Sequence, residues 1–586
     1  MKFNQVSKGK NQVFNYGNAP AYRLSPEWNL YTSVVTSMVS EKYYETASDR
    51  LEMLRNLIRM TDPQFVARLA IYARDRMNLR SIPLVLAVEL AKIHSGDSLI
   101  QKMTEKIIQR ADEITELLAY YQMANDRKAT KKLNRLSKQI QAGLQNAFNK
   151  FDEYQFAKYN RDTEIKFRDA LFLVHPKAKN DEQQLIFDKI AGNKLQTPYT
   201  WETELSALGQ NKFESIKAKK EAFTRKWEEL IDSGKVGYMA LLRNLRNILE
   251  ADVSALHIHR VCETISDKEK VLQSKQFPFR FLAAYRELSQ IDSDGTVKKM
   301  KKEIEMKRAE IEMKRKPLEN MFKIFKGDIA KINELLMETA EYREYRELLS
   351  EDNKLLTEYN ELLTESLTTK DFLPEYIISV KNALEDAVKA AAGNIAGFDE
   401  TTKVLIACDV SGSMQQAISP NSKMMNYDIG LMLGMLLKSR CENAVCGIFG
   451  DTWKIVNLPD SGILSNVDEF YKREGEVGYS TNGHLVIEDL INREEVMDKI
   501  MIFTDCQLWD STGKDIRLKD VWQKYKTIAP KARLYLFDLA GYGRIPLDIT
   551  NDDVRLIAGW SDKIFDILQA IDHGSDALKE IRAIEI

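Results

Sequence analysis

Hydrophobic positions in the first 290 residues recur mostly with the period of an α-helix. The stretch "SPEWNLYTSVVTSMVS" begins with a capping serine, Ser25, and a proline at the first helical position. A similar start follows at Asp62–Pro63. The segment "SIPLVLAVELAKIHSGD" is apolar on nearly all sides, which is typical of a helix packed between other helices. Because short breaks recur every 15–20 residues or so, we expect antiparallel helix pairs stacked as a solenoid.

The pattern changes between about residues 293 and 369. There "KKMKKEIEMKRAEIEMKRK" places Met300, Ile304 and Ile311 at spacings of four and seven within a dense mixture of charges, and Pro317 interrupts the helix. This arrangement is typical of a projecting helical hairpin. Its basic end would suit nucleic acid, but we favour a solvated helix face.

Beyond residue 399 the pattern changes again, to short β-rich runs that alternate with helical segments. The runs are "KVLIAC", "NAVCGIFG", "TWKIVNL", "KIMIFT" and "ARLYLFD". Uninterrupted apolar strands alternating with helices predict a mainly parallel sheet covered on both faces. We therefore divide the chain into a helical module (1–292), a charged helical insertion (293–369), a return to the helical module with a linker (370–398) and an α/β domain (399–586).

Oxygen-bearing side chains follow the first of these strands. In "VLIACDVSGSM", Asp409, Ser411 and Ser413 supply hard oxygen ligands in a tight loop, and "MIFTD" brings Asp505 to the same edge of the sheet. Magnesium prefers octahedral oxygen coordination and keeps several waters, so these side chains predict a Mg²⁺ site. A loop in which Ser411 merely caps a helix is the structural alternative.

A third hydroxyl for this site comes from "VGYSTNGH", which offers Thr481, with Ser480 as the alternative. The DxSxS pattern, a distant threonine and a later aspartate resemble the metal-ion-dependent adhesion site of von Willebrand factor A domains. That resemblance implies that Ser411, Ser413 and Thr481 bind the metal directly, while Asp409 and Asp505 act behind them. An acidic group of a partner protein would complete the metal's shell. The chain departs from the related pattern at Asn482, where an aspartate is common.

The charge is distributed unevenly along the chain. Residues 1–290 contain 46 Lys and Arg against 35 Asp and Glu, and residues 291–586 contain 39 against 52, although the whole chain has a net charge of −2. A basic half joined to an acidic half indicates that the first half meets a polyanion. Solvated faces of long helices remain the alternative.

Several function classes are disfavoured. The five cysteines form no CxxC pair, which fits a reduced cytosol and argues against a structural zinc site. The first residues do not resemble a signal peptide, and no apolar stretch approaches the ~20 residues that cross a bilayer. Because no nucleophile–base arrangement or paired-carboxylate signature stands out, we expect a non-catalytic protein. The cysteines and the lack of a long apolar stretch predict that it is cytoplasmic and has no membrane partner.

The helical half resembles a known RNA-binding module. The stretches "NAPAYRLSPEWNLYTSVVTS", "LRSIPLVLAVELAK", "KWEELIDSGKVGYMALLRNLRNI" and "FPFRFLAAYRELSQ" together resemble the TROVE module of the Ro autoantigen family, most closely that of bacterial Ro proteins. The order of the domains agrees with that family too, because a stack of helix pairs precedes the domain that contains "DVSGSM". The resemblance implies an all-α ring of HEAT-like helical repeats plus a doubly wound α/β von Willebrand factor A domain, in a monomer. It also implies that the basic outer surface binds Y RNA, that single-stranded 3′ ends of misfolded noncoding RNA enter the ring, and that an exoribonuclease is a possible partner.

The stretch "AKYNRDTEIKFRDALFLVHPK" resembles the family segment that contacts Y RNA. The basic and histidine positions of that segment, and two lysines just beyond it, are occupied by Lys158, Arg161, Lys166, Arg168, His175, Lys177 and Lys179. Arg168 and His175 are seven residues apart, about two helical turns, so we expect them on one face. We expect Pro176 to end the helix there and to leave His175 at its rim. A further basic cluster between Arg127 and Lys138 would extend this track, although we favour a solvated helix face for it. We therefore predict an RNA-binding protein, with a metal-dependent protein-binding scaffold that has no RNA role as the alternative.

Overall fold

The computed structural model describes residues 12–36, 45–125, 136–289, 373–393, 397–419, 422–459, 462–514 and 516–586, with residues 291, 347, 350 and 395 besides. The chain divides into two compact units. The first comprises Met1–Thr203, Ser266–Ala283 and Glu385–Ile586, and the second comprises Glu204–Ile265 and Ala284–Leu384.

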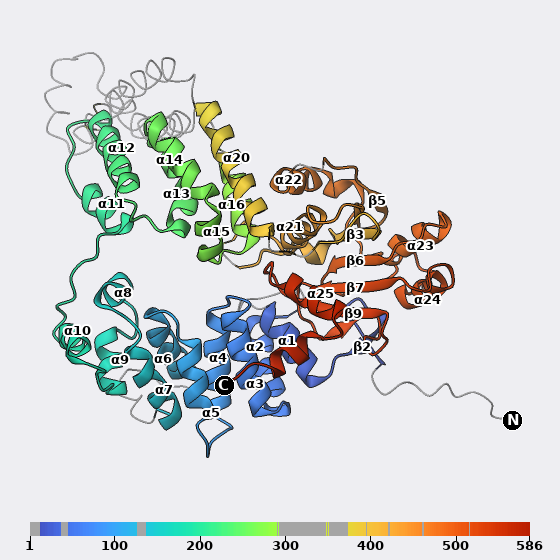
Figure 1. The fold of residues 1–586 in the computed structure, drawn as a ribbon, viewed down its shortest axis with the longest axis horizontal. Coiled ribbons are helices and arrows are strands. Elements are labelled where there is room, and N and C mark those ends of the chain that lie inside the picture. Colours follow the sequence, from blue (N-terminus) through green and yellow to red (C-terminus); the bar gives the residue numbers. More distant parts are fainter. Residues whose placement is uncertain are drawn as a thin grey trace, which may run out of the picture. The chain divides into compact units, whose positions relative to one another are not determined.

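The first unit begins with a succession of helices, which Figure 1 shows in blue to cyan. They are α1 (Pro26–Val35), α2 (Ala47–Met60), α3 (Pro63–Asp75), α4 (Ser81–Ala91), α5 (Leu99–Ile107), α6 (Asp112–Ala124), α7 (Lys138–Phe148), α8 (Glu153–Lys158), α9 (Phe167–Val174) and α10 (Asp181–Ala191). The predicted start of α1 is confirmed: Ser25 Oγ accepts a hydrogen bond from the Trp28 amide, and Pro26 is the first helical residue. Helix α3 likewise starts at Pro63.

Each of these helices packs against helices nearby in the sequence. Helix α4 contacts α3, α5 and α6, and its residues from Ile82 to Leu90 are all buried, as its apolar pattern predicted. Helix α5 packs on α7, and α9 packs on α6, α7 and α10. The predicted stack of helices is confirmed in this part of the chain.

The C-terminal part of the first unit is an α/β domain. Its six-stranded sheet has the order β5-β4-β3-β6-β7-β9. The strands are β3 (Val404–Asp409), β4 (Ala444–Phe449), β5 (Trp453–Ile455), β6 (Lys499–Thr504), β7 (Arg533–Asp538) and β9 (Val554–Ala558). All neighbours are parallel except β4 and β5, so the mainly parallel sheet expected from the apolar runs is confirmed.

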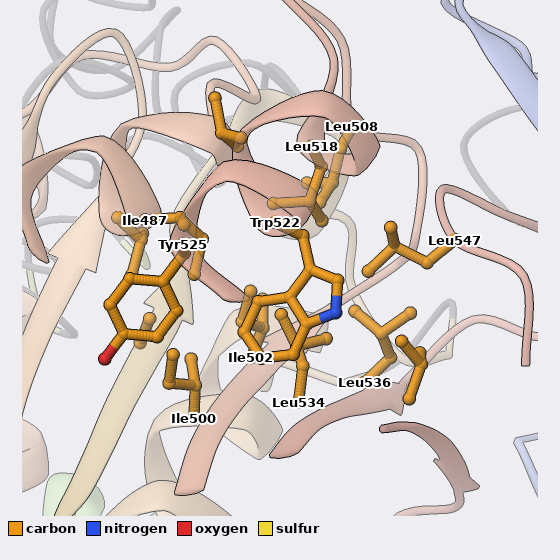
Figure 2. Close-up of a cluster of buried hydrophobic side chains, with 14 of the residues drawn as sticks. Ile487, Ile500, Ile502, Leu508, Leu518, Trp522, Tyr525, Leu534, Leu536 and Leu547 are labelled. Atoms are coloured by element: carbon orange, nitrogen blue, oxygen red, sulfur yellow. The ribbon is translucent and has the colours of Figure 1, made fainter. Parts of the chain in front are cut away.

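Helices cover both faces of this sheet, and alternate residues of β3 face opposite sides. On one side, α21 (Asn426–Lys438) packs so closely that a Cβ on Gly434 would lie 3.0 Å from Cys408 Sγ and 3.2 Å from Ile406 Cγ2. On the other side, Leu405 and Ala407 join a core that includes side chains of α23 (His484–Asn492) and α24 (Leu518–Ile528). Figure 2 shows this second core, with Trp522 and Tyr525 of α24 lying over Ile500, Ile502 and Leu534. The doubly wound architecture is confirmed.

The first and last parts of the chain meet within the first unit. Strand β1 (Gln12–Phe14) pairs with β2 (Pro20–Arg23), which pairs in turn with β8 (Arg544–Ile545). At the other end, α26 (Ala577–Arg582) packs on α3, and Arg68 Nε donates to the Ile584 carbonyl at 3.1 Å. Figure 1 shows the C-terminus beside α3 and α5. The N-terminal helices and the α/β domain therefore fold as one body.

The second unit is helical. It contains most of α11 (Trp201–Gly209) and α14 (Ala255–Ser266), together with α12 (Ile216–Asp232) and α13 (Tyr238–Glu250). Hydrogen bonds join these helices: Thr224 Oγ1 donates to the Ala251 carbonyl, and the Tyr238 hydroxyl donates to the Ile265 carbonyl at 2.7 Å. Helices α16 (Pro278–Ser289) and α20 (Leu373–Ala392) have residues in both units.

Two further sequence predictions concern the charged insertion and the absence of a membrane-spanning helix. The charged insertion predicted at 293–369 lies outside the described residues, apart from positions 347 and 350. Within the part of the chain that the structure describes, no helix combines the length and apolarity that a membrane span needs.

Candidate metal and RNA sites

The predicted metal ligands converge at the carboxyl ends of two neighbouring strands. Asp409 is the last residue of β3, and Asp505 follows the last residue of β6, the strand beside it. The Ser411 amide donates to Asp409 Oδ1 at 2.9 Å, and the hydroxyl oxygens of Ser411 and Ser413 are 3.4 Å apart. All four side chains are buried. We call Asp409–Met414 the metal loop.

A second loop brings Thr481 to the same edge of the sheet. The Gly412 amide donates to the Tyr479 carbonyl at 2.9 Å, which joins this loop to the metal loop. Thr481 is buried, and its Oγ1 donates to the Gln507 carbonyl at 3.3 Å, two residues after Asp505. Ser480 is only partly buried, and its amide donates to Asp451 instead. The structure therefore favours Thr481 over Ser480 as the third hydroxyl.

The two carboxylates carry a charge that their surroundings do not compensate. Burial raises the pKa of Asp409, and burial together with the nearby Asp409 raises the pKa of Asp505. Asp505 Oδ2 is buried and has no hydrogen-bond partner among the described residues. A hydrated divalent cation would compensate both charges, and one of its water ligands would donate to that oxygen. The hydroxyls of Ser411 and Ser413 are hard ligands suited to such an ion. The residues present thus fit a magnesium-type ion.

Sequence reasoning missed the residues that hold these carboxylates. Thr504 Oγ1 donates to Asp409 Oδ2 at 2.6 Å, and the Gln507 amide donates to Asp505 Oδ1 at 2.9 Å. Cys506 between them adopts φ = 62°, a left-handed conformation that is strained for a side chain other than glycine. The signal for Thr504 was its position in "MIFTD", where its hydroxyl directly precedes Asp505.

The N-terminal segment also contacts the metal site. Asn15 Nδ2 donates to the Leu508 carbonyl at 2.8 Å, and the Tyr16 amide donates to Gln507 Oε1 at 3.0 Å. We call Asn15–Pro20 the strap. These contacts join residues almost 500 positions apart, so no local pattern in the sequence could have indicated them.

The predicted RNA-binding residues lie on the surface of the first unit, between the end of α8 and the start of α10. All seven side chains of this basic segment, Lys158–Lys179, are exposed. Lys158 ends α8, Lys166 precedes α9, and Arg168 lies in the first turn of α9. A surface pocket in this region is lined by Arg161, Lys166 and Arg168 together with residues of α10 and the loop after it.

The helix that carries Arg168 ends at His175. Helix α9 ends at Val174, and His175 caps it with φ = 50° and ψ = 56°, in the left-handed region. Because Pro176 follows, the right-handed helical conformation is disfavoured at His175. The predicted end of the helix before Pro176, with His175 at its rim, is therefore confirmed, and both side chains are exposed.

Aromatic rings accompany the basic side chains. Lys158 Nζ lies 5.8 Å from the ring centre of Tyr154 and 5.7 Å from that of Tyr159, and Arg168 Cζ lies 5.8 Å from that of Phe172. Tyr154 is 47% exposed and Phe172 is 53% exposed. Exposed rings beside cations offer both stacking surfaces for bases and charge for phosphates.

Some members of the segment already have partners. Lys166 pairs with Asp162 at 2.7 Å, and Arg161 lies 3.6 Å from Glu202. Lys179 Nζ donates to the Asn149 carbonyl at 2.7 Å. Of the cluster predicted to extend the track, Lys138 begins α7, and residues 126–135 lie outside the described residues.

Comparison with known proteins identifies the helical half. The TROVE domain matches residues 30–193 and 188–399, together more than half of the chain. The chain belongs to the TROVE domain family. Telomerase protein component 1 of Rattus norvegicus and that of Mus musculus are each 25% identical to it over 346 residues, which is 45% of this chain and 13% of either relative. The chain thus matches only a small part of these TROVE-family relatives.

A solved structure extends the similarity to the α/β domain. The crystal structure of the Deinococcus radiodurans RO (RSR) protein matches with a TM-score of 0.52 and 14% identity, and the match covers 94% of this chain and 100% of that one. At this identity the match shows the fold alone. With the TROVE match, it confirms the predicted kinship with Ro proteins and the order of a helical-repeat region followed by an α/β domain.

Proposed function

We propose that this TROVE-family protein is a non-catalytic RNA-binding protein of the cytoplasm, which takes up Y-like or misfolded noncoding RNA with single-stranded 3′ ends. The observation that carries the proposal is the basic segment Lys158–Lys179, where exposed cations lie beside exposed aromatic rings. Lysine and arginine attract phosphates of any sequence, whereas rings accept unpaired bases. The two kinds of side chain together favour structured RNA that also contains unpaired nucleotides.

RNA binding by this segment is tested by reversing two of its charges. Lys158→Glu with Arg168→Glu should weaken binding of a stem–loop RNA about tenfold or more, because both phosphate contacts become repulsive. The slope of log Kd against log salt concentration should fall by about 2, one for each lost contact. Filter binding at several salt concentrations measures both quantities.

A matched control carries the same change of charge elsewhere. Lys524 and Lys531 are exposed on the α/β domain, so Lys524→Glu with Lys531→Glu should leave affinity and slope near those of the wild type. If both double variants bind RNA equally well, the basic segment is not the binding surface. Labelled RNA incubated with the protein and magnesium should remain intact, and its cleavage would contradict the non-catalytic assignment.

We also propose that the α/β domain is a von Willebrand factor A domain that holds a divalent cation, Mg²⁺ in particular. Ser411, Ser413 and Thr481 would bind the ion, with Asp409 and Asp505 behind them. When bound, such an ion supplies a Lewis-acidic position that accepts an oxygen ligand from a partner. Asp505 Oδ2 supports this proposal, because it is buried and has no hydrogen-bond partner in the part of the chain that the structure describes. An acidic partner protein, an exoribonuclease among the candidates, would supply the missing carboxylate.

Calorimetric titration with Mg²⁺ tests the metal site directly. Ser411→Ala with Ser413→Ala should abolish the binding heat, since two proposed ligands are lost. Ser439→Ala serves as the control because Ser439 lies at the other end of the domain's first helix, where its Oγ donates to the Leu436 carbonyl. Equal heats from the two variants would remove the proposal. If the protein instead captures an acidic partner but binds no RNA, it is the metal-dependent scaffold.

A further inference from the structure

A pocket adjoins the proposed metal site and shares Thr481 with it. The strap residues Gly17–Pro20 form one wall, and Leu508 and Trp509 form another. Most of the remaining lining comes from the starts of α23 and α24, and Pro546, which follows β8, adds to it. Ile516, Leu518 and Pro546 are among the apolar side chains. Thr481 connects the two sites because the Trp509 amide donates to its Oγ1 at 3.2 Å. Thr481 is therefore shared by the proposed metal site and the pocket beside it.

The pocket is held in shape by the strap. The hydrogen bonds of Asn15 and Tyr16 to Leu508 and Gln507 fix the strap against the far wall. A Cβ on Gly17 would lie 3.0 Å from Trp509 Cδ1, so the strap touches the indole directly. The indole is nonetheless 40% exposed. An apolar side chain entering here finds a preformed surface, and little ordering is needed on binding.

The helix starts around the pocket favour an anionic ligand. Helices α23 and α24 start at His484 and Leu518, so the positive ends of two helix dipoles lie here. The guanidinium of Arg517 lies next to them and already pairs with Asp520, to whose Oδ2 its Nε donates at 3.0 Å. Asp510 is the opposing acid. Its Oδ1 accepts from the amide and hydroxyl of Thr512, and its Oδ2 accepts from the Ile516 amide. The Asp510 carboxylate is thus stabilised by hydrogen bonds within its own loop.

His484 adds a polar group that its surroundings do not satisfy. The side chain is 3% exposed, and its Nε2 has no hydrogen-bond partner among the residues that the structure describes. The nearest carboxylate oxygen, Asp510 Oδ1, is 3.9 Å away. A small movement of this ring on binding would allow it to donate to a ligand oxygen.

From these observations we infer that the pocket binds the apolar side chain next to an acidic residue of a partner peptide. The acidic side chain completes the shell of the ion at Ser411, Ser413 and Thr481. The neighbouring apolar side chain packs between the strap and the Leu508–Trp509 wall. The inference rests on the proposed metal site and adds to it a preference for the residue beside the acid.

Fluorescence anisotropy with short labelled peptides in Mg²⁺ tests the inference. The peptide Gly-Asp-Leu-Gly, with blocked ends, should bind about tenfold or more tightly than Gly-Asp-Ser-Gly, because only leucine gains from burial in the pocket. Gly-Asn-Leu-Gly should lose binding, as should Gly-Asp-Leu-Gly in EDTA. Mg²⁺ binding to the protein alone is measured separately by calorimetry.

Two variants locate the effect. Ala19→Phe should fill the pocket from the strap side, and Trp509→Ala should remove a wall. Each should reduce the leucine preference to about twofold or less, while Mg²⁺ binding persists because neither side chain is a proposed metal ligand. Phe14→Ala is the matched control, since Phe14 is 64% exposed and is not among the residues that line the pocket.

The outcomes separate the two proposals. Mg²⁺ binding with equal affinity for the leucine and serine peptides would overturn the inference and leave the metal site standing. A leucine preference that survives both pocket variants would also overturn it. Absence of Mg²⁺ binding to the wild-type protein would overturn the metal site, and the inference with it.

Discussion

Thr504 positions one of the two buried carboxylates of the proposed metal site. Its hydroxyl donates to Asp409 Oδ2 at 2.6 Å and accepts from the Cys506 amide at 3.2 Å. The same side chain therefore orients Asp409 and supports the left-handed turn at Cys506. Both atoms of the Asp409 carboxylate then have a donor, since Oδ1 accepts from the Ser411 amide.

Thr504→Val should keep the shape of this side chain and remove its hydroxyl. The buried Asp409 oxygen then loses its donor, which costs about 1–3 kcal/mol in the free energy of unfolding. Urea denaturation in EDTA measures that loss, and calorimetry should show weaker Mg²⁺ binding. Thr527→Val is the control, because Thr527 is exposed and donates only within α24. An unchanged urea midpoint for Thr504→Val would show that the hydroxyl does not support Asp409.

The exposed ring of Phe172 allows base stacking in the basic segment to be tested. Stacking of a base on a ring is worth about 1–3 kcal/mol, so Phe172→Ala should weaken single-stranded RNA binding about fivefold or more. Phe172→Trp should retain it. An oligomer with abasic sugars has phosphates but no bases, so it should bind the wild type and Phe172→Ala with equal affinity. Leu185→Ala, at a residue 62% exposed on the neighbouring α10, controls for loss of apolar surface. Equal binding of normal RNA by Phe172→Ala and the wild type would exclude stacking there.

At the level of elements, Glu113 joins the start of α6 to α3. Its side chain is fully buried, and Arg74 of α3 donates to its Oε1 at 2.8 Å. Its Oε2 accepts from the amides of Gln109 and Arg110, in the turn that enters α6. This carboxylate thus accepts hydrogen bonds from N–H groups that have no acceptor within the helix, and it compensates the charge of the buried Arg74 guanidinium. The stack of helices depends on a polar contact as well as on apolar packing.

Glu113→Gln should therefore destabilise the first unit strongly. The amide cannot compensate the charge of buried Arg74, and removing one partner of such a pair costs about 3–5 kcal/mol. Thermal unfolding followed by circular dichroism reports the loss. Glu116→Gln provides the comparison, because Glu116 is 43% exposed and pairs with Arg80, so its loss should cost less than about 1 kcal/mol. Similar melting temperatures for the two variants would contradict the role given to Glu113.

The sequence predicted elements well where the signal was local. The runs that became β3, β4, β6 and β7 were apolar in their interiors. Because parallel strands end at a shared edge of the sheet, the sequence alone was enough to place Asp409 near Asp505. The two-residue strand β8 has no such pattern, since its position depends on pairing with Tyr22. The end of α9 was again a local signal, because Pro176 disfavours the helical conformation at His175, whereas the left-handed conformation that His175 adopts was not indicated by the sequence.

At the scale of the molecule, the segment from the strap to α1 completes the α/β domain. Leu24 is buried in the core formed by the sheet with α23 and α24. The Tyr31 hydroxyl of α1 donates to the Ala558 carbonyl of β9 at 3.2 Å. Because the strap that follows β1 also contacts the metal site, the packing of the N-terminal segment and the geometry of that site depend on each other.

Leu24→Ala tests this dependence in the full chain. Truncating a buried leucine should cost about 2–5 kcal/mol, and the loss should reach beyond the N-terminus. Amides of β7 should lose hydrogen-exchange protection together with those of α3, because both belong to the first unit. Mg²⁺ affinity should fall as the strap loosens. Met60→Ala, at a residue 68% exposed on α2, should change neither quantity. If only α3 loses protection while β7 and Mg²⁺ binding stay as in the wild type, the α/β domain folds independently of its N-terminal segment.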